Sequence, residues 1–584
     1  MEKGPVYELP APVPQQLPKK SNARYALLAL IPAIYLLSVF RGDVLNGIVG
    51  PSPREHGLDK ATCYQPDPLF PSKGDEKLDE MYEHISSASF KKHSIERLSG
   101  AAQIPTQSFD DLGPIGEDPR WDVMYPFAEY LKKTFPLVHE HMDPEVVNTH
   151  GLIYTYKGSE SDLKPLLLMA HQDVVPVPNE TVSAWTHPPW SGYYDGKSIW
   201  GRGASDCKNQ LIAVMESMEL FLKAGFKPKR TIVLSFGFDE EISGREGAGS
   251  LAPYLLDRYG ENGLAAIVDE GAGFSKAWGS VFALPGTGEK GYTDVHITVR
   301  YPGGHSSIPT DHTSIGILSE IITKIEAEQY PTRLVDENPY LGELQCGAAH
   351  ATDFPSKLKK LLNQRYSSSI TCPNARQIND PLALEAAKAG RDIKYLMQTS
   401  QAVDVIRGGI KVNALPERVS VTINHRINIG AQPENVWARL TDLVRPIAKK
   451  YDLNLHAFDG TAEAPLSISL TASDTTLRPA PVTPTDGTAA DSPFAILAGT
   501  TRAVYGDAII VSPGMTTGNT DTRYYWDLTE HIFRFGPGYD PESDAGLGNI
   551  HTVDERVSVE NHLGMVRWFV MFVRNLDGRR LSGE

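Results

Sequence analysis

The chain has 584 residues, of which 41% are hydrophobic and 22% are charged, so it is long enough for two or more globular cores. Its formal net charge is −16, and no basic stripe is available to displace counterions, which excludes a nucleic-acid partner. The four cysteines lack CxxC spacing, which argues against a zinc–thiolate framework or a dense disulfide scaffold. At most one disulfide is expected, with Cys346–Cys372 the favoured pair, and Cys207 is expected to stay reduced.

Residues 1–40 have the pattern of a membrane anchor. A Pro-rich tail, residues 1–24, ends in basic side chains, and residues 25–40 carry no charge. This run is slightly shorter than the roughly 20 residues of a spanning helix, and a buried core helix is the alternative. Because no cleavage site of small residues follows, an uncleaved signal anchor is favoured over a removed signal peptide. The positive charge before the run predicts a cytosolic tail and a lumenal body, as in a single-pass type II membrane protein.

The segment after the anchor leads into a folded region. A Pro/Gly-rich stalk is expected over residues 41–70. Helices are predicted over 77–98 and 121–135, and an edge strand over 152–156. Asn179-Glu-Thr181 is the one N-glycosylation acceptor pattern that we find, and it fits a lumenal location.

Three predicted strands are followed by histidine, aspartate or glutamate residues, which are types that commonly bind metals. Each is an unbroken apolar run, which indicates a strand covered on both faces, as in a parallel sheet. Ligands bind beyond the carboxyl ends of such strands. Adjacent carboxylates there repel one another unless a cation is present, although a solvated acidic turn is the alternative. The runs and the side chains that follow them are 166–170 with His171 and Asp173, 231–238 with Asp239-Glu240-Glu241, and 264–268 with Asp269-Glu270.

Further candidate residues lie in loops. Asp206 follows a Gly-rich turn and precedes a helix with an apolar stripe over 211–222. A helix N-cap is its alternative role. His551 precedes the final helix, and Arg523 has the planar fork that suits a carboxylate, with a structural salt bridge as its alternative.

The strands and helices predict an α/β catalytic domain interrupted by a second domain. From Gly291 the sequence alternates as half-exposed strands do, and strands and helices over 293–458 have a βαββαβ-like order. A Lys-rich helical stretch covers 356–398, and residues 461–490 are expected to be an irregular loop. The catalytic domain is thus predicted to consist of two segments, 71–290 and 461–577, separated by an inserted α+β lid domain over 291–460.

Two histidines, several carboxylates and a spare acid beside a ligand acid form the set that a two-metal hydrolytic site requires. One carboxylate bridges the cations, and each cation needs one histidine and one more carboxylate, with a position left for water. The non-ligating acid then removes a proton from that water. The nitrogen and oxygen donors favour zinc over calcium or magnesium.

Seven motifs occur in one order: LLLMAHQDVVPV, WGRGASDCKN, FGFDEE, IVDEG, GGHSSIP, TDTRYY and IHTVDERV. Together they resemble the zinc aminoacylase/carboxypeptidase family of metallopeptidases, over roughly residues 70–575. The resemblance implies a zinc exopeptidase fold with a mostly parallel central sheet and an inserted lid, and two Zn²⁺ per chain. It also implies a cis peptide after Asp206. The implied metal ligands are His171, Asp206 as the bridge, Glu241, His551, and either Asp269 or Glu270, with Asp269 favoured by spacing.

The resemblance also assigns catalytic and substrate-binding roles. Asp173 is expected to orient His171, Glu240 to be the general base, and His305 to stabilise the oxyanion, which in dimeric members is done from the partner subunit. Arg523 is expected to bind the substrate's carboxylate. Weaker lid candidates are Asn413 and Arg426. The long insertion at about 330–400 departs from compact members and leaves open whether a lid-to-lid homodimer forms.

The favoured function is a di-zinc carboxypeptidase that hydrolyses the C-terminal peptide bond of short peptides in a vacuolar lumen. The alternative with the same chemistry is an N-acyl-amino-acid hydrolase, because it needs the same zinc pair and carboxylate anchor. A more remote alternative is a catalytically dead binding ectodomain on this fold.

Overall fold

The computed structural model describes residues 63–367, 380–543, 548–582 and 584. The predicted tail, the signal anchor and most of the stalk lie outside these residues. Within the part of the chain that is described, no helix is both long and apolar enough to cross a bilayer.

An eight-stranded sheet holds the three predicted strands next to one another, in the order β1-β2-β6-β3-β7-β20-β10-β19. β3 lies parallel to both β6 and β7, and all its residues are buried, as its unbroken apolar run predicts. The predicted edge strand β2 is instead an inner strand, because β1 pairs outside it. The strands are β1 (Asp143–Val147), β2 (Gly151–Tyr156), β3 (Leu166–His171), β6 (Ile232–Gly237), β7 (Ala266–Ala272), β10 (Gly286–Glu289), β19 (Gly514–Thr516) and β20 (Ile532–Phe535).

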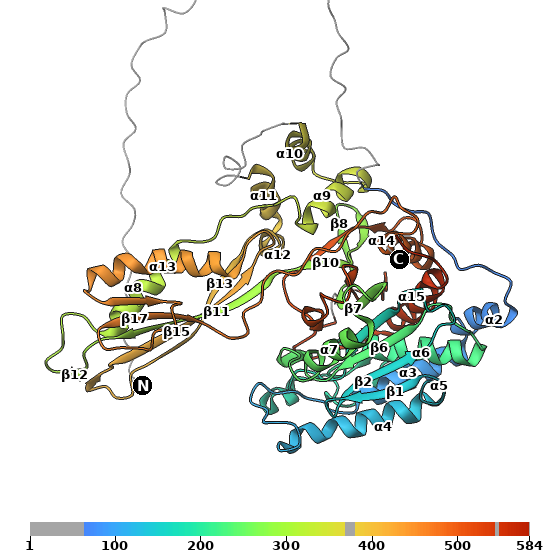
Figure 1. Cartoon of the computed structure of the whole chain (residues 1–584), viewed down its shortest axis with the longest axis horizontal. Helices are drawn as coiled ribbons and strands as arrows, with labels where there is room; N and C mark the ends of the chain where they lie inside the picture. Colours follow the sequence, from blue (N-terminus) through green and yellow to red (C-terminus); the bar gives the residue numbers. More distant parts are fainter. Residues whose placement is uncertain (1–62, 368–379, 544–547, 583) are drawn as a thin grey trace, which may run out of the picture. The chain divides into compact units, whose positions relative to one another are not determined.

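Helices cover both faces of this sheet (Figure 1), which confirms the α/β fold class. Leu166, Leu168 and Ala170 pack with the helices of one face, whereas Leu167 and Met169 pack around α7 (Ala248–Tyr259) on the other. The predicted helix over 77–98 is two helices, because Ser87 caps the second one. The first face carries α2 (Glu76–Ile85), α3 (Ala88–Ala102), α4 (Met124–Thr134), α5 (Pro136–His141), α6 (Lys208–Ala224), α14 (Pro493–Tyr505) and α15 (Val559–Leu576).

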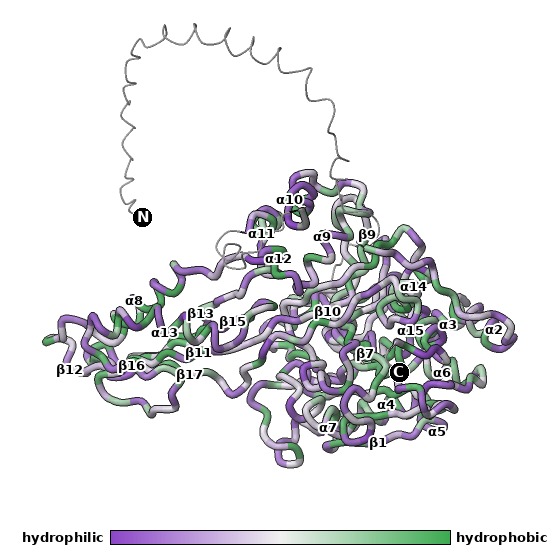
Figure 2. Tube along the Cα trace, turned by 45° about the horizontal axis from the view of Figure 1, so that its top comes forward, coloured by the Kyte–Doolittle hydropathy of each residue, from purple (hydrophilic) through white to green (hydrophobic). Residues whose placement is uncertain are grey.

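The inserted domain is built on a five-stranded sheet, in the order β13-β15-β11-β17-β16. Two helices, α8 (Ser314–Ala327) and α13 (Pro433–Lys450), pack against its apolar residues. Apolar stretches alternate with polar ones along the helices and strands, as half-buried elements require (Figure 2). The strands are β11 (Gly291–Arg300), β13 (Ser400–Gly408), β15 (Arg418–Ile427), β16 (Asn454–Ala457) and β17 (Ser467–Ala472).

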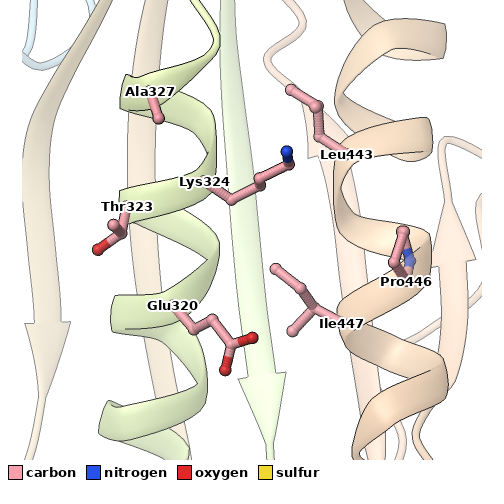
Figure 3. A pocket seen from close by; sticks show the side chains of 7 residues that line it. All are labelled: Glu320, Thr323, Lys324, Ala327, Leu443, Pro446 and Ile447. Carbon is pink, nitrogen blue, oxygen red and sulfur yellow. The ribbon is translucent and has the colours of Figure 1, made fainter.

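β17 lies beyond the boundary expected at residue 460, within the stretch expected to be an irregular loop. A short alternating run, Ser467-Ile-Ser-Leu470, lies among Thr/Pro/Ala-rich residues and is therefore hard to recognise as a strand. Its Ile468 and Leu470 are buried in the core of the inserted domain. A groove between α8 and α13 is lined by Glu320, Lys324, Leu443 and Ile447 among others, and by none of the predicted site residues (Figure 3).

The described residues of the insertion, 330–367 and 380–400, are largely helical and have an apolar cluster of their own. Its buried members include Leu344, Leu362, Leu382 and Met397. Within its described residues, the predicted helical stretch over 356–398 contains three separate α-helices. The helices of this insertion are α9 (Pro339–His350), α10 (Ser356–Ser367), α11 (Pro381–Ala386) and α12 (Arg391–Tyr395).

A disulfide joins the insertion to the start of the described chain. The sequence led us to expect a Cys346–Cys372 disulfide, and this prediction is wrong. Cys346 pairs with Cys63, because α9 brings Cys346 against the segment that holds Cys63. Cys207 is a buried free cysteine, as expected. The bond closes a loop of 283 residues, which sequence spacing gives no means of finding.

We expect Cys63→Ser to lower the free energy of unfolding by about 2–5 kcal/mol, because it removes a long-range cross-link. Cys372→Ser is the matched control and should leave the thermal midpoint unchanged. Thermal unfolding and peptide mapping without reductant measure both. A peptide linked through Cys346 and Cys372 would contradict the assignment.

Candidate metal centre and cleft

The last residue of β3, His171, is held by a residue two positions further along. Its Nδ1 atom lies 3.0 Å from the backbone oxygen and 3.2 Å from the carboxylate of Asp173. Its Nε2 atom therefore faces the other way, 3.3 Å from Asp206 and 3.4 Å from Glu270. A fixed imidazole with its second nitrogen free for a ligand is the arrangement typical of a metal-binding histidine.

Asp173 also fixes the acidic triplet at the end of β6. Its fully buried carboxylate accepts hydrogen bonds from the Ser108 hydroxyl at 2.6 Å and from the backbone amides of Glu240 and Glu241 at 3.1 Å each. One side chain thus positions both the end of β3 and the beginning of the next loop. Glu240 and Glu241 begin a short 3-10 helix, and both line the cleft beside it.

Asp206 lies between the two histidines. Its Oδ1 faces His171, and its Oδ2 lies 3.0 Å from Nε2 of His551. The same His551 nitrogen lies 3.1 Å from Glu241. The peptide bond Asp206–Cys207 is cis, as the resemblance implied. Residues separated by hundreds of positions therefore meet around one carboxylate.

A small antiparallel sheet brings the loop of His551 to this place. β21 (Arg556–Ser558) pairs with β5 (Ser198–Trp200), so the segments that precede α15 and α6 lie side by side. Between them the buried Glu555 accepts hydrogen bonds from the amides of Ser205 at 2.9 Å and Asp206 at 3.0 Å. Its other oxygen binds the buried guanidinium of Arg202 at 2.5 Å.

Sequence reasoning missed Glu555, although this residue stands within the IHTVDERV motif. Apart from Arg202, its side-chain partners are backbone amides, which no residue type or spacing marks. Glu555 is nevertheless the group that holds the backbone of Asp206 in place.

The path of β7 distinguishes Asp269 from Glu270, the two residues between which the sequence left the choice of metal ligand open. Asp269 and Glu270 are both within β7, and successive side chains of a strand point to opposite faces. Glu270 lies beside His171 and lines the cleft, whereas Asp269 is buried near Arg534. The geometry therefore brings Glu270, and not the favoured Asp269, to the histidine.

The carboxylates shift one another's protonation. Burial, with the charge of Glu270, raises the pKa of Glu240 well above its usual value, and burial raises the pKa of Glu270 to about 8. Hydrogen bonds to Asp206 and Glu241 raise the pKa of His551 to about 10. Burial opposes ionisation of Asp206, but hydrogen bonds from the two histidines hold its pKa well below the usual range. The carboxylates outnumber the imidazoles, so the site favours cations.

The side chains fit metal binding. Two sets of ligand atoms gather, each within 4.8 Å of one another: His171, Asp206 and Glu241, and His171, Cys207 and Glu270. The buried Oε1 atom of Glu241 has no hydrogen-bond partner, which is costly unless a cation binds it.

The candidate metal ligands Asp206, Glu241, Glu270 and His551 line a cleft of about 1260 Å³. Other stretches of its wall come from the inserted domain, including Arg426 of β15, whose guanidinium donates to Oδ1 of Asn519 at 3.0 Å. Arg523 is not among the lining residues, and its Nε donates to the backbone oxygen of Thr520. The structure thus brings Arg426, the weaker candidate, into the cleft.

His305 lies elsewhere. It is exposed on β12 (Gly304–His305), which pairs with β14 (Ala414–Leu415) next to Asn413, and its Nδ1 accepts hydrogen bonds from Ser307. It is not among the residues that line the cleft of its own chain.

Residues 167–575 match the model of the peptidase family M20/M25/M40. The chain belongs to this family. It is 39% identical to carboxypeptidase S of Saccharomyces cerevisiae, over 96% of this chain and 98% of that protein. It is 30% identical to an N-fatty-acyl-amino acid synthase/hydrolase of Mus musculus, over 94% of this chain and 97% of that protein.

A solved structure with the same fold supports the architecture. Human carnosine dipeptidase 1 superposes with a TM-score of 0.57 at 16% identity, over 87% of this chain and 99% of that one. The chain is thus a hydrolase of the M20 metallopeptidases and a homologue of carboxypeptidase S, which confirms the resemblance seen in its motifs.

We expect Glu555→Ala to weaken metal affinity about 10- to 100-fold, because the amides that position Asp206 lose their acceptor. Competition with a chelator measures this. Glu555→Gln, which keeps an acceptor oxygen, should lose less.

Glu560→Ala removes an exposed carboxylate from the same region and is the control. Equal metal affinity in a folded Glu555→Ala variant would contradict the positioning role.

Proposed function

We propose that this M20 hydrolase is a zinc-dependent carboxypeptidase that cleaves the C-terminal peptide bond of short peptides. The observation that carries the proposal is the position of Asp206 between His171 and His551, with Glu240 in the same cleft. The likeness to carboxypeptidase S over nearly the whole chain supports it.

Two zinc ions would share Asp206. One would be held by His171 and Glu270, and the other by His551 and Glu241, an all-nitrogen and oxygen donor set that suits zinc. Glu270 takes the place of Asp269 in this assignment. When bound, the ions make water a stronger nucleophile and polarise the scissile carbonyl.

Glu240 is the proposed general base. It lines the cleft, and Asp173 fixes its backbone. A buried carboxylate whose pKa is raised accepts the proton of the attacking water and passes it to the leaving amine.

Arg426 is the proposed anchor for the substrate's carboxylate, in place of Arg523. Its guanidinium lines the cleft, and Asn519 on one side and the ring of Tyr292 on the other fix its direction. A planar guanidinium binds a carboxylate through two parallel hydrogen bonds.

A homodimer would give His305 a role. We propose that its imidazole stabilises the oxyanion in the partner's cleft, as the resemblance implies for dimeric members. The support is a set of exposed apolar side chains at the same end of the inserted domain, which include Ile308, Ile410 and Val412, at 82%, 101% and 99% exposure.

We propose a vacuolar lumen as the location, with residues 25–40 as the anchor. The Cys63–Cys346 disulfide requires an oxidising compartment, and Asn179 of the acceptor pattern is exposed. The likeness to carboxypeptidase S supports the choice of organelle.

The rival function is hydrolysis of N-acyl amino acids. It is favoured by the 30% identity to the N-fatty-acyl-amino acid synthase/hydrolase and would use the same base and anchor.

We expect Glu240→Gln to lower kcat by about 10²- to 10⁴-fold and to retain zinc, because it removes the base but no ligand. His551→Ala should lose zinc. Steady-state assays and elemental analysis separate the two effects.

Glu246→Gln makes the same chemical change at a nearby exposed position and should leave both kcat and the zinc content unchanged. Near-normal turnover by Glu240→Gln would contradict the assigned base, and a chain without zinc would favour a binding ectodomain.

The substrate is tested with Gly-Leu, its C-terminal amide and an N-acyl leucine. We expect Gly-Leu to be the best substrate and the amide to be poor, because Arg426 then lacks a carboxylate partner. Arg426→Ala should lower kcat/KM for Gly-Leu about 10- to 100-fold, and Arg523→Ala much less.

Faster turnover of the N-acyl leucine would favour the rival function. An equal loss in both arginine variants would contradict the choice of Arg426.

A further inference from the structure

The wall of the cleft beside Arg426 is built by the helical insertion. Ile393 and Tyr395 of α12 and Leu396 after it line the cleft, together with Met515 of β19. Met515 is buried in the apolar cluster of the insertion, and Ile393 and Leu396 pack against that cluster. Ile393, Tyr395, Leu396 and Met515 together form what we call the insertion wall.

Lys290 holds the insertion wall in place. It is fully buried at the junction of β10 and β11, and its ammonium donates to the backbone oxygens of Tyr395 at 3.0 Å and Gln398 at 2.6 Å. The amide of Asn338 donates to the backbone oxygen of Leu396 at 2.9 Å. Because buried donors occupy these carbonyls, the wall offers mainly apolar side chains to the cleft.

We propose that the insertion wall is the pocket for the side chain of the substrate's C-terminal residue, and that it selects apolar side chains such as leucine and phenylalanine. This inference rests on the proposed function, in which Arg426 binds the terminal carboxylate. The α-carbon that carries the side chain is bonded to that carboxylate, so the side chain must lie beside the guanidinium, where the insertion wall begins.

Charge at the wall supports the same preference. Lys290 donates to two backbone carbonyl oxygens of the insertion, so two of its three N–H groups already have partners. Asp392, exposed at the edge of the wall, repels such a side chain. An apolar side chain, in contrast, loses contact with water against Leu396 and Met515.

The test compares kcat/KM for Gly-Leu, Gly-Ala and Gly-Asp with the zinc-loaded full chain. We expect Gly-Leu to exceed Gly-Ala about 10- to 100-fold and Gly-Asp to be the poorest. Leu396→Ala combined with Met515→Ala should bring the Gly-Leu to Gly-Ala ratio close to 1. Ile393→Ala, a single change at a partly exposed position, should lower the same ratio if the double variant does not fold.

Leu384→Ala is the control, because Leu384 is 48% exposed on α11 and does not line the cleft. It should keep the full ratio. A wild-type enzyme without preference, or wall variants that keep it, would overturn the inference. If only N-acyl substrates are cleaved, the proposed function fails, and the same ratio measured with N-acyl leucine and N-acyl alanine still decides the role of the wall.

Discussion

The site depends on one carboxylate placed between two imidazoles. Asp206 touches His171 from the end of β3 and His551 from the loop before β21, and these residues are otherwise remote in the chain. Such a carboxylate stays ionised only because cationic or metal-bound partners surround it. Other groups hold these residues in place. Asp173 contacts His171, Glu555 accepts a hydrogen bond from the backbone amide of Asp206, and Arg202 pairs with Glu555.

The sequence predicted the regions of the fold that strong local patterns determine. The unbroken apolar runs gave β3, β6 and β7, because burial on both faces leaves only apolar residues. β17 was missed, since its alternating run is short and lies among Thr and Pro residues. The disulfide was assigned to the wrong partner, because pairing depends on where α9 packs and not on spacing.

For the site, the sequence could predict which types of residue take part, but not which side chains face the cleft. His171, Asp206, Glu241 and His551 meet as their motifs suggested. Asp269 and Glu270 could not be told apart, because only the path of β7 decides which of two adjacent acids faces the histidine. The position of Arg426 could not be predicted for a similar reason: the pairing of β15 with β11 places it at the cleft, and no local pattern indicates that.

A single residue, Lys290, separates β10 of the first sheet from β11 of the second. Of the proposed zinc ligands, His171 and Glu270 belong to strands of the first sheet, and the proposed base Glu240 follows its strand β6. Arg426 belongs to the second sheet, opposite Tyr292 of β11. In the proposed assignment, this junction would set the distance between the scissile bond and the terminal carboxylate of the substrate. In the same assignment, a peptide cut further from its terminus would place an uncharged amide at Arg426, which would disfavour endopeptidase activity.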